Sequence, residues 1–378
     1  MKKQLIFRGS DAYSAFEEYL ISSGRKKILA VYGESLSESS AGRFFSSLTA
    51  HTGIEVVRFS GFTPNPDYSE IVTGVRLFRS SGCDMICCAG GGSAMDTGKC
   101  IKLFADMPDG KEFFRQEIVQ NDIPLSVIPS TAGTGSETTR YAVIYHNNVK
   151  ISVTHESCVP SAVLFDPSLL DTLPAMHKKS AMLDALCHGI ESFWSVNSTP
   201  VSRELSKQAI TTVLHSMDGY ISGDRSCAEL MLAAANTAGK AIDITATTAG
   251  HAMCYKLTSL YHIPHGHAAA LCVPQVYRFM LDSTERCCDK RGSEYLTDTL
   301  HQLAFLLGTD SPQHAFAFLE SLPSQLGLHS PSDVSDDDIH LLSVSFNPER
   351  LRNNPVIPDT DDLYRMYRHI LCRKTEYT

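Results

Sequence analysis

The sequence has no run of lysines and arginines, and acidic side chains outnumber basic ones by 42 to 33, which gives a formal net charge of −9. Non-specific nucleic-acid binding requires a basic surface, so we expect no nucleic-acid partner. An anionic small molecule would therefore have to be held by a local group of basic side chains.

Long apolar segments are also missing. No run of about 18 apolar residues occurs, so we expect no association with a membrane. The first apolar residues end at Arg8, which leaves too short a stretch for the core of a signal peptide. The 12 cysteines are too sparse and irregular for a disulfide framework, and they form no paired Cys-x-x-Cys units of a zinc ribbon. We expect reduced thiols in a cytoplasmic protein.

Internal repeats and low-complexity linkers are absent, but the hydrophobic pattern changes near the middle of the 378 residues. Apolar runs first alternate with helical periods, which favours parallel βαβ units, and amphipathic helices then follow one another. We therefore predict an α/β lobe over residues 1–174 and an all-α lobe over residues 175–378. The expected strands are Ile28–Tyr32, Ile54–Phe59, Met85–Ala89, Leu125–Pro129, Tyr141–Tyr145 and Ala162–Phe165. The expected helices are Asp11–Ser23, Ser40–Ala50, Tyr68–Ser81, Lys178–Ser195, Val201–Gly219, Cys227–Ile244, Glu294–Leu307 and Pro312–Leu322.

A glycine triplet follows the third expected strand. Gly90, Gly91 and Gly92 precede Ser93 and the start of a helix, so bare backbone N–H groups and a helix N-terminus lie at the end of the strand. This arrangement binds phosphate, although the triplet could also be a tight strand-to-helix turn. The spacing differs from the G-x-G-x-x-G of the common dinucleotide fingerprint.

A second loop, Pro129–Thr139, is rich in small and hydroxyl residues. Four hydroxyl side chains precede Glu137 and can bond phosphate or an amide, although such runs also occur as ordinary polar turns. The two loops are expected to leave neighbouring strands at the same edge of the sheet. A pyrophosphate could then span both loops.

Candidate metal ligands come from two separated segments. Asp184 and His188 stand four residues apart, and on a helix they project from one face, close enough to hold one ion. Downstream, His251, His265 and His267 supply up to three more imidazoles. One carboxylate with three imidazoles suits Fe²⁺ or Zn²⁺, but the pattern does not decide between His265 and His267. Asp-x-x-x-His alone is also compatible with a surface Asp and a hydrogen-bonded His.

Taken together, these motifs resemble the iron-containing (group III) alcohol dehydrogenase family. The resemblance extends over nearly the whole chain, from Phe62–Pro66 to Asn353–Pro355, and its motifs occur in the family's order. They are Gly90–Ser93 with Asp96 and Lys99, Thr131–Glu137, Asp184-Ala185-Leu186-x-His188-x-x-Glu191, His251, and Pro264-His265-Gly266.

The resemblance implies an N-terminal dinucleotide-binding lobe, a helical metal-binding lobe and a site in the cleft between them, a fold shared with dehydroquinate synthase. It also implies a homodimer or larger homo-oligomer. The implied metal ligands are Asp184, His188, His251 and His265. The implied cofactor-binding residues are Gly90, Gly91, Gly92, Ser93, Asp96, Thr131, Thr134, Ser136 and Lys150.

The sequence departs from the family pattern one turn after the third ligand. Many members have another histidine there, and this chain has Tyr255. On a helix Tyr255 shares a face with His251, so its hydroxyl could relay a proton near the substrate oxygen, or it could be an ordinary core tyrosine. His267 and water are the other candidates for the relay.

The segment Ile242–Ala269 is most similar to the branch of the family that reduces phosphonoacetaldehyde to 2-hydroxyethylphosphonate. The metal would act as a Lewis acid on the aldehyde oxygen, and the nicotinamide would deliver hydride. A phosphonate dianion also needs several fixed donors. The candidates are Arg140, Lys256, His267, Arg350 and Arg352.

The choice of cofactor depends on the turn Val31–Ser35 after the first main strand. An acidic side chain there would bond the ribose hydroxyls and repel a 2′-phosphate. The family position for that acid is Gly33 here, which leaves room for NADPH, whereas the neighbouring Glu34 favours NADH. We predict a site formed by Gly33 and Ser35 that takes NADPH in preference to NADH.

Three alternatives to this function remain open. A general short-chain alcohol or aldehyde dehydrogenase of the same family would lack the phosphonate requirement. A dehydroquinate synthase-like lyase or cyclase would use the same fold, nucleotide and metal for an elimination. A non-catalytic sensor is disfavoured because the ligands and both cofactor loops are intact.

Overall fold

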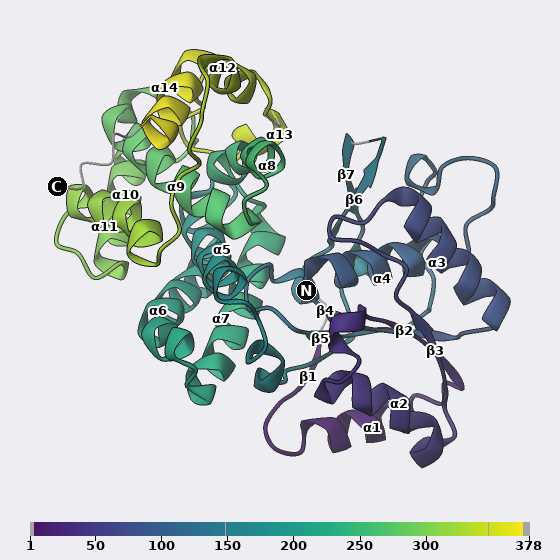
Figure 1. Ribbon diagram of the computed structural model, residues 1–378. Helices are drawn as coiled ribbons and strands as arrows, with labels where there is room; N and C mark the ends of the chain where they lie inside the picture. Colours follow the sequence, from purple (N-terminus) through teal and green to yellow (C-terminus); the bar gives the residue numbers. More distant parts are fainter. Residues whose placement is uncertain (1–3, 148, 347, 373–378) are drawn as a thin grey trace. The chain divides into compact units, whose positions relative to one another are not determined.

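The computed structural model describes residues 4–147, 149–346 and 348–372. The chain folds into two compact units that adjoin in sequence between Leu173 and Pro174 (Figure 1). The first unit combines strands and helices, and the described part of the second contains helices and no strand. This confirms the predicted fold class.

The first unit is built on a six-stranded parallel sheet with the strand order β1-β8-β5-β4-β2-β3. The two central strands, β4 and β5, are buried at every residue, as expected for a parallel sheet with helices on both faces. They are paired so that Gly90 lies opposite Pro129, and both chains therefore leave the sheet at the same edge. The strands are β1 (Leu5–Phe7), β2 (Lys27–Val31), β3 (Glu55–Phe59), β4 (Met85–Gly90), β5 (Leu125–Pro129) and β8 (Ala162–Leu164).

Helices cover both faces of this sheet (Figure 1). Local sequence sets their ends: α3 begins at a capping box formed by Asp67 and Glu70 and ends at Gly82, whose φ is 68°. One face carries α1 (Ala12–Ser22) and α2 (Ser40–Thr52), and the other carries α3 (Tyr68–Ser81) and α4 (Gly92–Phe104). Short 3-10 turns connect the elements at Glu34–Leu36, Phe113–Arg115, Ser136–Thr138, Glu156–Cys158 and Pro167–Leu170.

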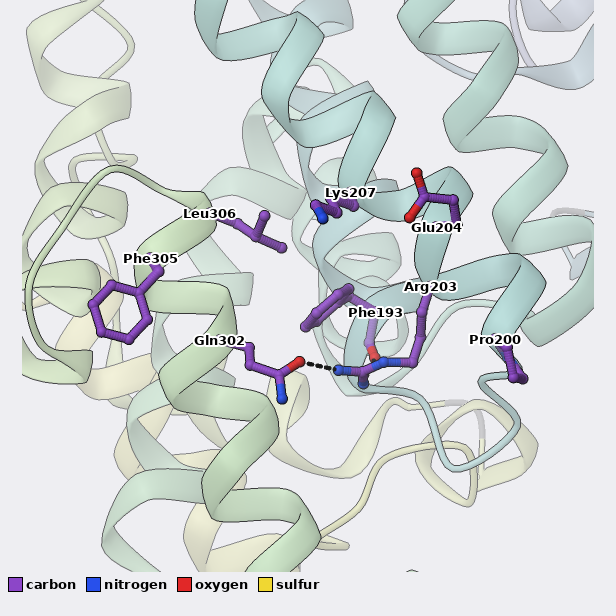
Figure 2. Close-up of a pocket in the computed structure, with 8 residues that line it drawn as sticks. All are labelled: Phe193, Pro200, Arg203, Glu204, Lys207, Gln302, Phe305 and Leu306. Carbon is purple, nitrogen blue, oxygen red and sulfur yellow. Dashed lines mark hydrogen bonds between the residues drawn. The ribbon is translucent and has the colours of Figure 1, made fainter.

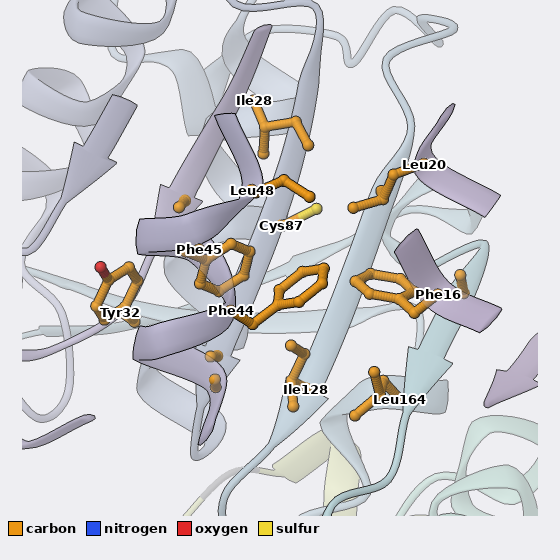
Figure 3. Close-up of a cluster of buried hydrophobic side chains, with 14 of the residues drawn as sticks. Phe16, Leu20, Ile28, Tyr32, Phe44, Phe45, Leu48, Cys87, Ile128 and Leu164 are labelled. Carbon is orange, nitrogen blue, oxygen red and sulfur yellow. The ribbon is translucent and has the colours of Figure 1, made fainter. Parts of the chain in front are cut away.

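Figure 3 shows the core between the sheet and helices α1 and α2. Aromatic side chains from the two helices pack on aliphatic side chains of the strands, and all of them are buried. Burial of each large side chain contributes about 1.5–3 kcal/mol, so this cluster fixes the sheet whose edge carries the two loops. The labelled members are Phe16, Leu20, Ile28, Tyr32, Phe44, Phe45, Leu48, Cys87, Ile128 and Leu164.

Two strands form a separate antiparallel ribbon, β6 (Tyr141–His146) with β7 (Val149–Thr154). The first was expected among the strands of the parallel lobe, and the second was not predicted. Burial explains the difference, because it alternates along the first four residues of β6, whereas β4 and β5 are buried at every position. Alternation is typical of a ribbon with one covered face.

The second unit is organised around helix α5, in which every residue from Met182 to Trp194 is buried. It packs against α6, α7 and α9. A helix that is buried on all sides belongs to the interior of a large helical domain. The helices are α5 (Ala175–Trp194), α6 (Pro200–Ser222), α7 (Arg225–Thr245), α8 (Ala249–Tyr261), α9 (His265–Asp282), α10 (Ser293–Leu306), α11 (Pro312–Gln325), α12 (Asp336–Val344), α13 (Pro348–Leu351) and α14 (Thr360–Leu371), with a 3-10 turn at Thr284–Arg286.

The sequence predicted neither a membrane-spanning helix nor a disulfide framework. Among the described helices, none combines the length and the apolar character that a bilayer crossing requires. All twelve cysteines are free thiols, and eight of them are buried. The chain therefore depends on packing rather than on disulfides for its stability.

Candidate metal centre

Four predicted metal ligands come together in the second unit. Asp184 and His188 lie one turn apart in α5, His251 lies in the first turn of α8, and His265 is the first residue of α9. The Nε2 atoms of His251, His265 and His188 lie 3.3, 3.9 and 4.0 Å from the same oxygen, Oδ1 of Asp184. Ligand atoms of a tetrahedral ion with bonds of about 2.1 Å are about 3.4 Å apart, so this cluster is close to a metal-binding arrangement.

The cluster is buried except at one ligand. Asp184, His188 and His251 are 2%, 5% and 1% exposed, whereas the side chain of His265 is 35% exposed. The ligand atoms of the three buried residues lie within 4.8 Å of one another. One carboxylate oxygen and three imidazole nitrogens are a donor set that Fe²⁺ and Zn²⁺ accept. The residues therefore fit a divalent transition metal with one accessible side at His265.

The charges in the cluster compensate one another. Burial alone would raise the pKa of Asp184, but the three surrounding imidazoles outweigh burial and hold that pKa well below its usual value. Burial also lowers the pKa of His251, but the carboxylates of Glu191 and Asp184 outweigh burial and raise that pKa to about 9. In the metal-free protein, a protonated imidazole thus balances the buried carboxylate.

Gly266 lets α9 approach α5 closely. A Cβ atom at this position would lie 2.0 Å from the carbonyl oxygen of Ser180 and 2.6 Å from Cβ of Asp184. Both distances are far below van der Waals contact, so only glycine fits. This close approach brings His265, the preceding residue, beside Asp184.

Glu191 is a neighbour of the cluster and is not among the predicted site residues. It is fully buried in α5, and its Oε2 bonds Nδ1 of His251. Its Oε1 accepts hydrogen bonds from the backbone of Thr248 and His251 and from the hydroxyl of Thr248. Its place in the Asp-x-x-x-His-x-x-Glu motif was the available signal, but the partner helix lies about 60 residues away in sequence.

His267 contacts Ser180 and His329. Its backbone N–H donates to the hydroxyl of Ser180, and its ring lies beside His329. Burial, the largest effect, lowers the pKa of His267 to about 4. Since no contact with Asp184 is recorded for His267 within the described ranges, the geometry favours His265 over His267 as the fourth ligand.

Tyr255, a candidate proton relay, and Arg350, a candidate phosphonate donor, lie near the cluster. The ring of Tyr255 stacks on that of His265 at a centroid distance of 5.4 Å. Burial raises the pKa of Tyr255 to about 12, although the nearby Arg350 acts in the opposite direction. The guanidinium of Arg350 donates to the hydroxyl of Thr247, just before α8. Lys256 follows Tyr255 in α8 and is half-buried, and Arg352 is exposed.

In the first unit, the glycine loop and the hydroxyl-rich loop lie side by side. A Cβ atom on Gly91 would come within 3.2 Å of Thr131, and one on Gly92 within 3.3 Å of Thr134. Gly90 has a φ of 154°, a conformation that other residues rarely adopt. Ser93 accepts a hydrogen bond from the backbone of Asn65 at 3.1 Å. The expected adjacency of the two loops is therefore present.

Two predicted cofactor residues bond each other instead of standing open. The hydroxyl of Ser136 donates to Asp96 at 2.9 Å, and the other oxygen of Asp96 accepts from the backbone of Val143. The fully buried Lys99 donates to Ser136, Thr139 and Tyr141. This network ties the second loop to α4.

Lys150 and Arg140, two basic side chains of the first unit, each interact with a carboxylate. Burial raises the pKa of Asp96, and the charge of Lys150, on β7, acts against that increase. Arg140 forms an ion pair with Glu156. Lys150 therefore belongs to the ribbon that follows the second loop, and Arg140 directly precedes it.

The turn after β2 carries Gly33, Glu34 and Ser35. The atom nearest to a Cβ built on Gly33 is Oγ of Ser35, at 3.9 Å, so this position is spacious. The carboxylate of Glu34 forms an ion pair with Arg58 at 2.8 Å. The guanidinium of Arg58 also lies over the ring of Tyr32, 4.4 Å from its centroid.

A groove of about 490 Å³ lies elsewhere on the second unit, between α6 and α10 (Figure 2). The guanidinium of Arg203 lies 3.9 Å from the ring centroid of Phe193 and donates to Gln302 and to the carbonyl of Phe193. None of the predicted site residues is among the described residues that line this groove. The lining is Phe193, Pro200, Arg203, Glu204, Lys207, Gln302, Phe305 and Leu306.

The chain is similar to known proteins and solved structures over most of its length. It is 31% identical to the 1,3-propanediol dehydrogenase of Citrobacter freundii over 324 residues, 83% of each chain. It is 32% identical to the phosphonoacetaldehyde reductase of Streptomyces viridochromogenes over 307 residues, 77% of each chain. The crystal structure of a 1,3-propanediol oxidoreductase superposes with a TM-score of 0.86 at 27% identity and covers 97% of both chains.

Two family descriptions match almost the whole chain. The iron-containing alcohol dehydrogenase description matches residues 4–167, and the C-terminal Fe-containing alcohol dehydrogenase description matches residues 179–371. The second match begins inside α5, at residue 179, and includes all four proposed ligands. With relatives above 30% identity over most of its length, this chain belongs to the iron-containing alcohol dehydrogenase family of NAD(P)-linked, metal-binding oxidoreductases.

Proposed function

We propose that the enzyme reduces phosphonoacetaldehyde to 2-hydroxyethylphosphonate with NADPH and a divalent metal, Fe²⁺ or Zn²⁺. The observation that carries the metal assignment is the approach of three imidazole Nε2 atoms to one oxygen of Asp184 inside a helical core. Such a cluster is costly to bury without a function, and the proposed ligands are Asp184, His188, His251 and His265.

A bound ion would polarise the aldehyde oxygen as a Lewis acid while a nicotinamide supplies hydride. The protein's own residues must then hold the substrate and deliver a proton. His265 is the exposed ligand, so the substrate would approach on its side of the cluster. Tyr255 stacks on His265, and with a pKa raised to about 12 its hydroxyl keeps its proton at neutral pH. We assign the proton relay to Tyr255 rather than to His267, which lies beside His329.

The dinucleotide is assigned to the edge of the sheet in the first unit. The N-cap of α4 is Gly91, which makes no side-chain cap, so the first N–H groups of the helix can bond a pyrophosphate. Ser93, Thr131 and Thr134 supply hydroxyls near this terminus. Asp96, Ser136 and Lys150 would support the loops through their mutual contacts, because the first two already bond each other.

The turn after β2 supports a preference for NADPH. In the strand order, the connections run in opposite directions from β2 and β4, and dinucleotides bind at such a switch point. Gly33 leaves space for a 2′-phosphate, and Ser35 offers a hydroxyl beside it. The charge of Glu34 is compensated by Arg58, which could itself contact the phosphate. Each of these features favours NADPH over NADH.

The phosphonate is assigned to basic side chains near the cluster. Arg350 lies close to Tyr255 and bonds Thr247, so it is held in place beside the ligand helix. Lys256 follows Tyr255 directly. These two are the main proposed anchors, with Arg352 and, in the first unit, Arg140 as further candidates. The similarity to a phosphonoacetaldehyde reductase supports this substrate class.

The test is a panel of short aldehydes with and without a phosphonate group, followed by NADPH and NADH absorbance with Fe²⁺ or Zn²⁺ added. We expect kcat/KM for phosphonoacetaldehyde to exceed that for propanal or acetaldehyde. Equal values would favour a general alcohol dehydrogenase, which the similarity to a 1,3-propanediol dehydrogenase supports. Turnover of a sugar phosphate without net cofactor oxidation would instead favour a lyase or cyclase.

A further inference from the structure

We propose that Glu191, which does not itself reach the cluster of ligand atoms, is a positioning residue that fixes the tautomer and location of His251. The proposal rests on the metal centre proposed above. It predicts that the affinity for metal depends on a carboxylate outside the ligand set.

The hydrogen bond between Glu191 and the ring of His251 has a fixed direction. An ionised carboxylate can only accept, so its bond to Nδ1 of His251 requires the proton to be on Nδ1. When the ring loses its other proton to bind a metal, Nε2 carries the lone pair, and Nε2 is the atom that lies 3.3 Å from Asp184. Glu191 thereby selects the tautomer that can bind a metal.

Glu191 also fixes the position of the His251 ring. Helix α8 begins after Thr248, whose side chain makes no cap to the helix. Oε1 of Glu191 takes that role from another helix, because it accepts from the backbone N–H groups of Thr248 and His251, both at 3.2 Å. One carboxylate therefore holds His251 by its ring and by its backbone.

Neighbouring buried groups hold the carboxylate of Glu191 in one orientation. The hydroxyl of Thr248 donates to Glu191 at 2.7 Å and accepts from the indole of Trp194 at 2.9 Å. A Cβ atom on Gly250 would lie 3.0 Å from Oε1. All these residues are buried, so water does not compete for the bonds. The network is preorganised before any metal arrives.

The variant Glu191→Gln tests the role with little change in volume. Its amide oxygen can still accept from Thr248 and the backbone of His251, so the cap on α8 is kept. Its amide nitrogen, however, donates to Nδ1 of His251 and favours the tautomer with the proton on Nε2. We expect the affinity of metal-stripped protein for Zn²⁺ to fall by about 10–100-fold in competition with a chromogenic chelator.

Asp362→Asn is the matched control. Asp362 is a buried carboxylate that accepts hydrogen bonds from the backbone of Asp359 and from arginine side chains at the start of α14. The Asp362→Asn variant should lower the thermal midpoint of the metal-free protein at least as much as Glu191→Gln does. It should leave the affinity for Zn²⁺ unchanged. If both variants weaken metal binding equally, or if Glu191→Gln binds Zn²⁺ like the wild type, Glu191 is only structural and the inference is overturned.

Two further variants separate the possible failures. If Glu191→Gln does not fold, Glu191→Asp keeps the charge but withdraws it from His251, and it should also weaken Zn²⁺ binding; wild-type affinity would overturn the inference. Asp184→Asn tests the metal centre itself. If that variant loses affinity and Glu191→Gln does not, only the role of Glu191 fails. If Asp184→Asn also binds Zn²⁺ normally, the proposed metal centre is wrong.

Discussion

Replacing Gly266 by alanine should weaken metal binding more than it weakens the fold. The new Cβ would lie 2.0 Å from the carbonyl oxygen of Ser180, where ordinary contact begins at about 3.4 Å. The obstacle is backbone, so α9 has to move away from α5. Overpacking of this kind costs about 1–3 kcal/mol, and the better helix propensity of alanine returns about 1 kcal/mol.

The consequence for the metal is larger, because His265 moves with Gly266. Metal–ligand distances tolerate only about 0.2 Å of change. A shift large enough to relieve the contact would therefore remove His265 from the coordination sphere, with an expected loss in affinity of about tenfold or more. The assay is chelator competition on metal-stripped protein, with urea unfolding of the same metal-free sample.

Gly219→Ala is the control for this experiment. Its Cβ would lie 2.4 Å from Sγ of Cys227, which is the end of a side chain in the contact between α6 and α7. It should shift the urea midpoint and leave metal affinity unchanged. Wild-type affinity in Gly266→Ala, or an equal loss in Gly219→Ala, would refute the reasoning that close helix approach positions His265.

Removing the metal with a chelator should abolish aldehyde reduction, and adding Zn²⁺ or Fe²⁺ at 100 times Kd should restore it and raise the free energy of unfolding by about 2.7 kcal/mol; full activity in the chelated protein would contradict the metal role. Tyr255→Phe should lower kcat by about 10²–10⁴-fold with unchanged Zn²⁺ affinity, and an unaltered kcat would exclude Tyr255 from the relay. Gly33→Asp should weaken NADPH binding relative to NADH by about tenfold, or about 1.4 kcal/mol, in a fluorescence titration; an unchanged ratio would exclude this turn from cofactor choice. Burial raises the pKa of Asp362, but the Arg286 hydrogen bond and other partners outweigh it and give a net decrease. The stabilisation it provides is therefore present above about pH 4 and lost as the pH falls through its folded pKa. Asp362→Asn should be less stable at pH 7 and lose less stability in acid, and an equal acid loss would count against this assignment.

Sequence spacing predicted the local part of the metal cluster and left the long-range part open. Asp184 and His188 could be paired because four residues make about one helical turn. His265 and His267 are two residues apart, so on a helix they point in widely different directions and only one can face α5. The choice depends on how α9 docks, which is set by the contact of Gly266 with Ser180.

In the hydroxyl-rich loop, the sequence could not show which hydroxyl groups are available to a ligand. Its composition predicted donors open to a ligand, but the structure uses Ser136 to bond Asp96 and Lys99. Serine and threonine side chains often bond neighbouring groups in the protein, and a sequence does not reveal which hydroxyls are used in this way. Likewise, the strand at Tyr141 was recognisable from its residues, but its partner β7 was not.

Helix α5 shows why the contacts that sequence spacing could not predict are concentrated at the candidate site. Its buried segment carries Asp184, His188 and Glu191 at intervals of four and three residues, so these three side chains form one polar stripe among mostly apolar residues. Each buried charge would cost several kcal/mol without partners. The partners come from the first turns of α8 and α9, where His251 and His265 add imidazoles to the partial positive charge of the helix N-termini. A stripe of charge inside a helical core therefore predicts that other helices begin at it, and this prediction can be made before any ligand is identified.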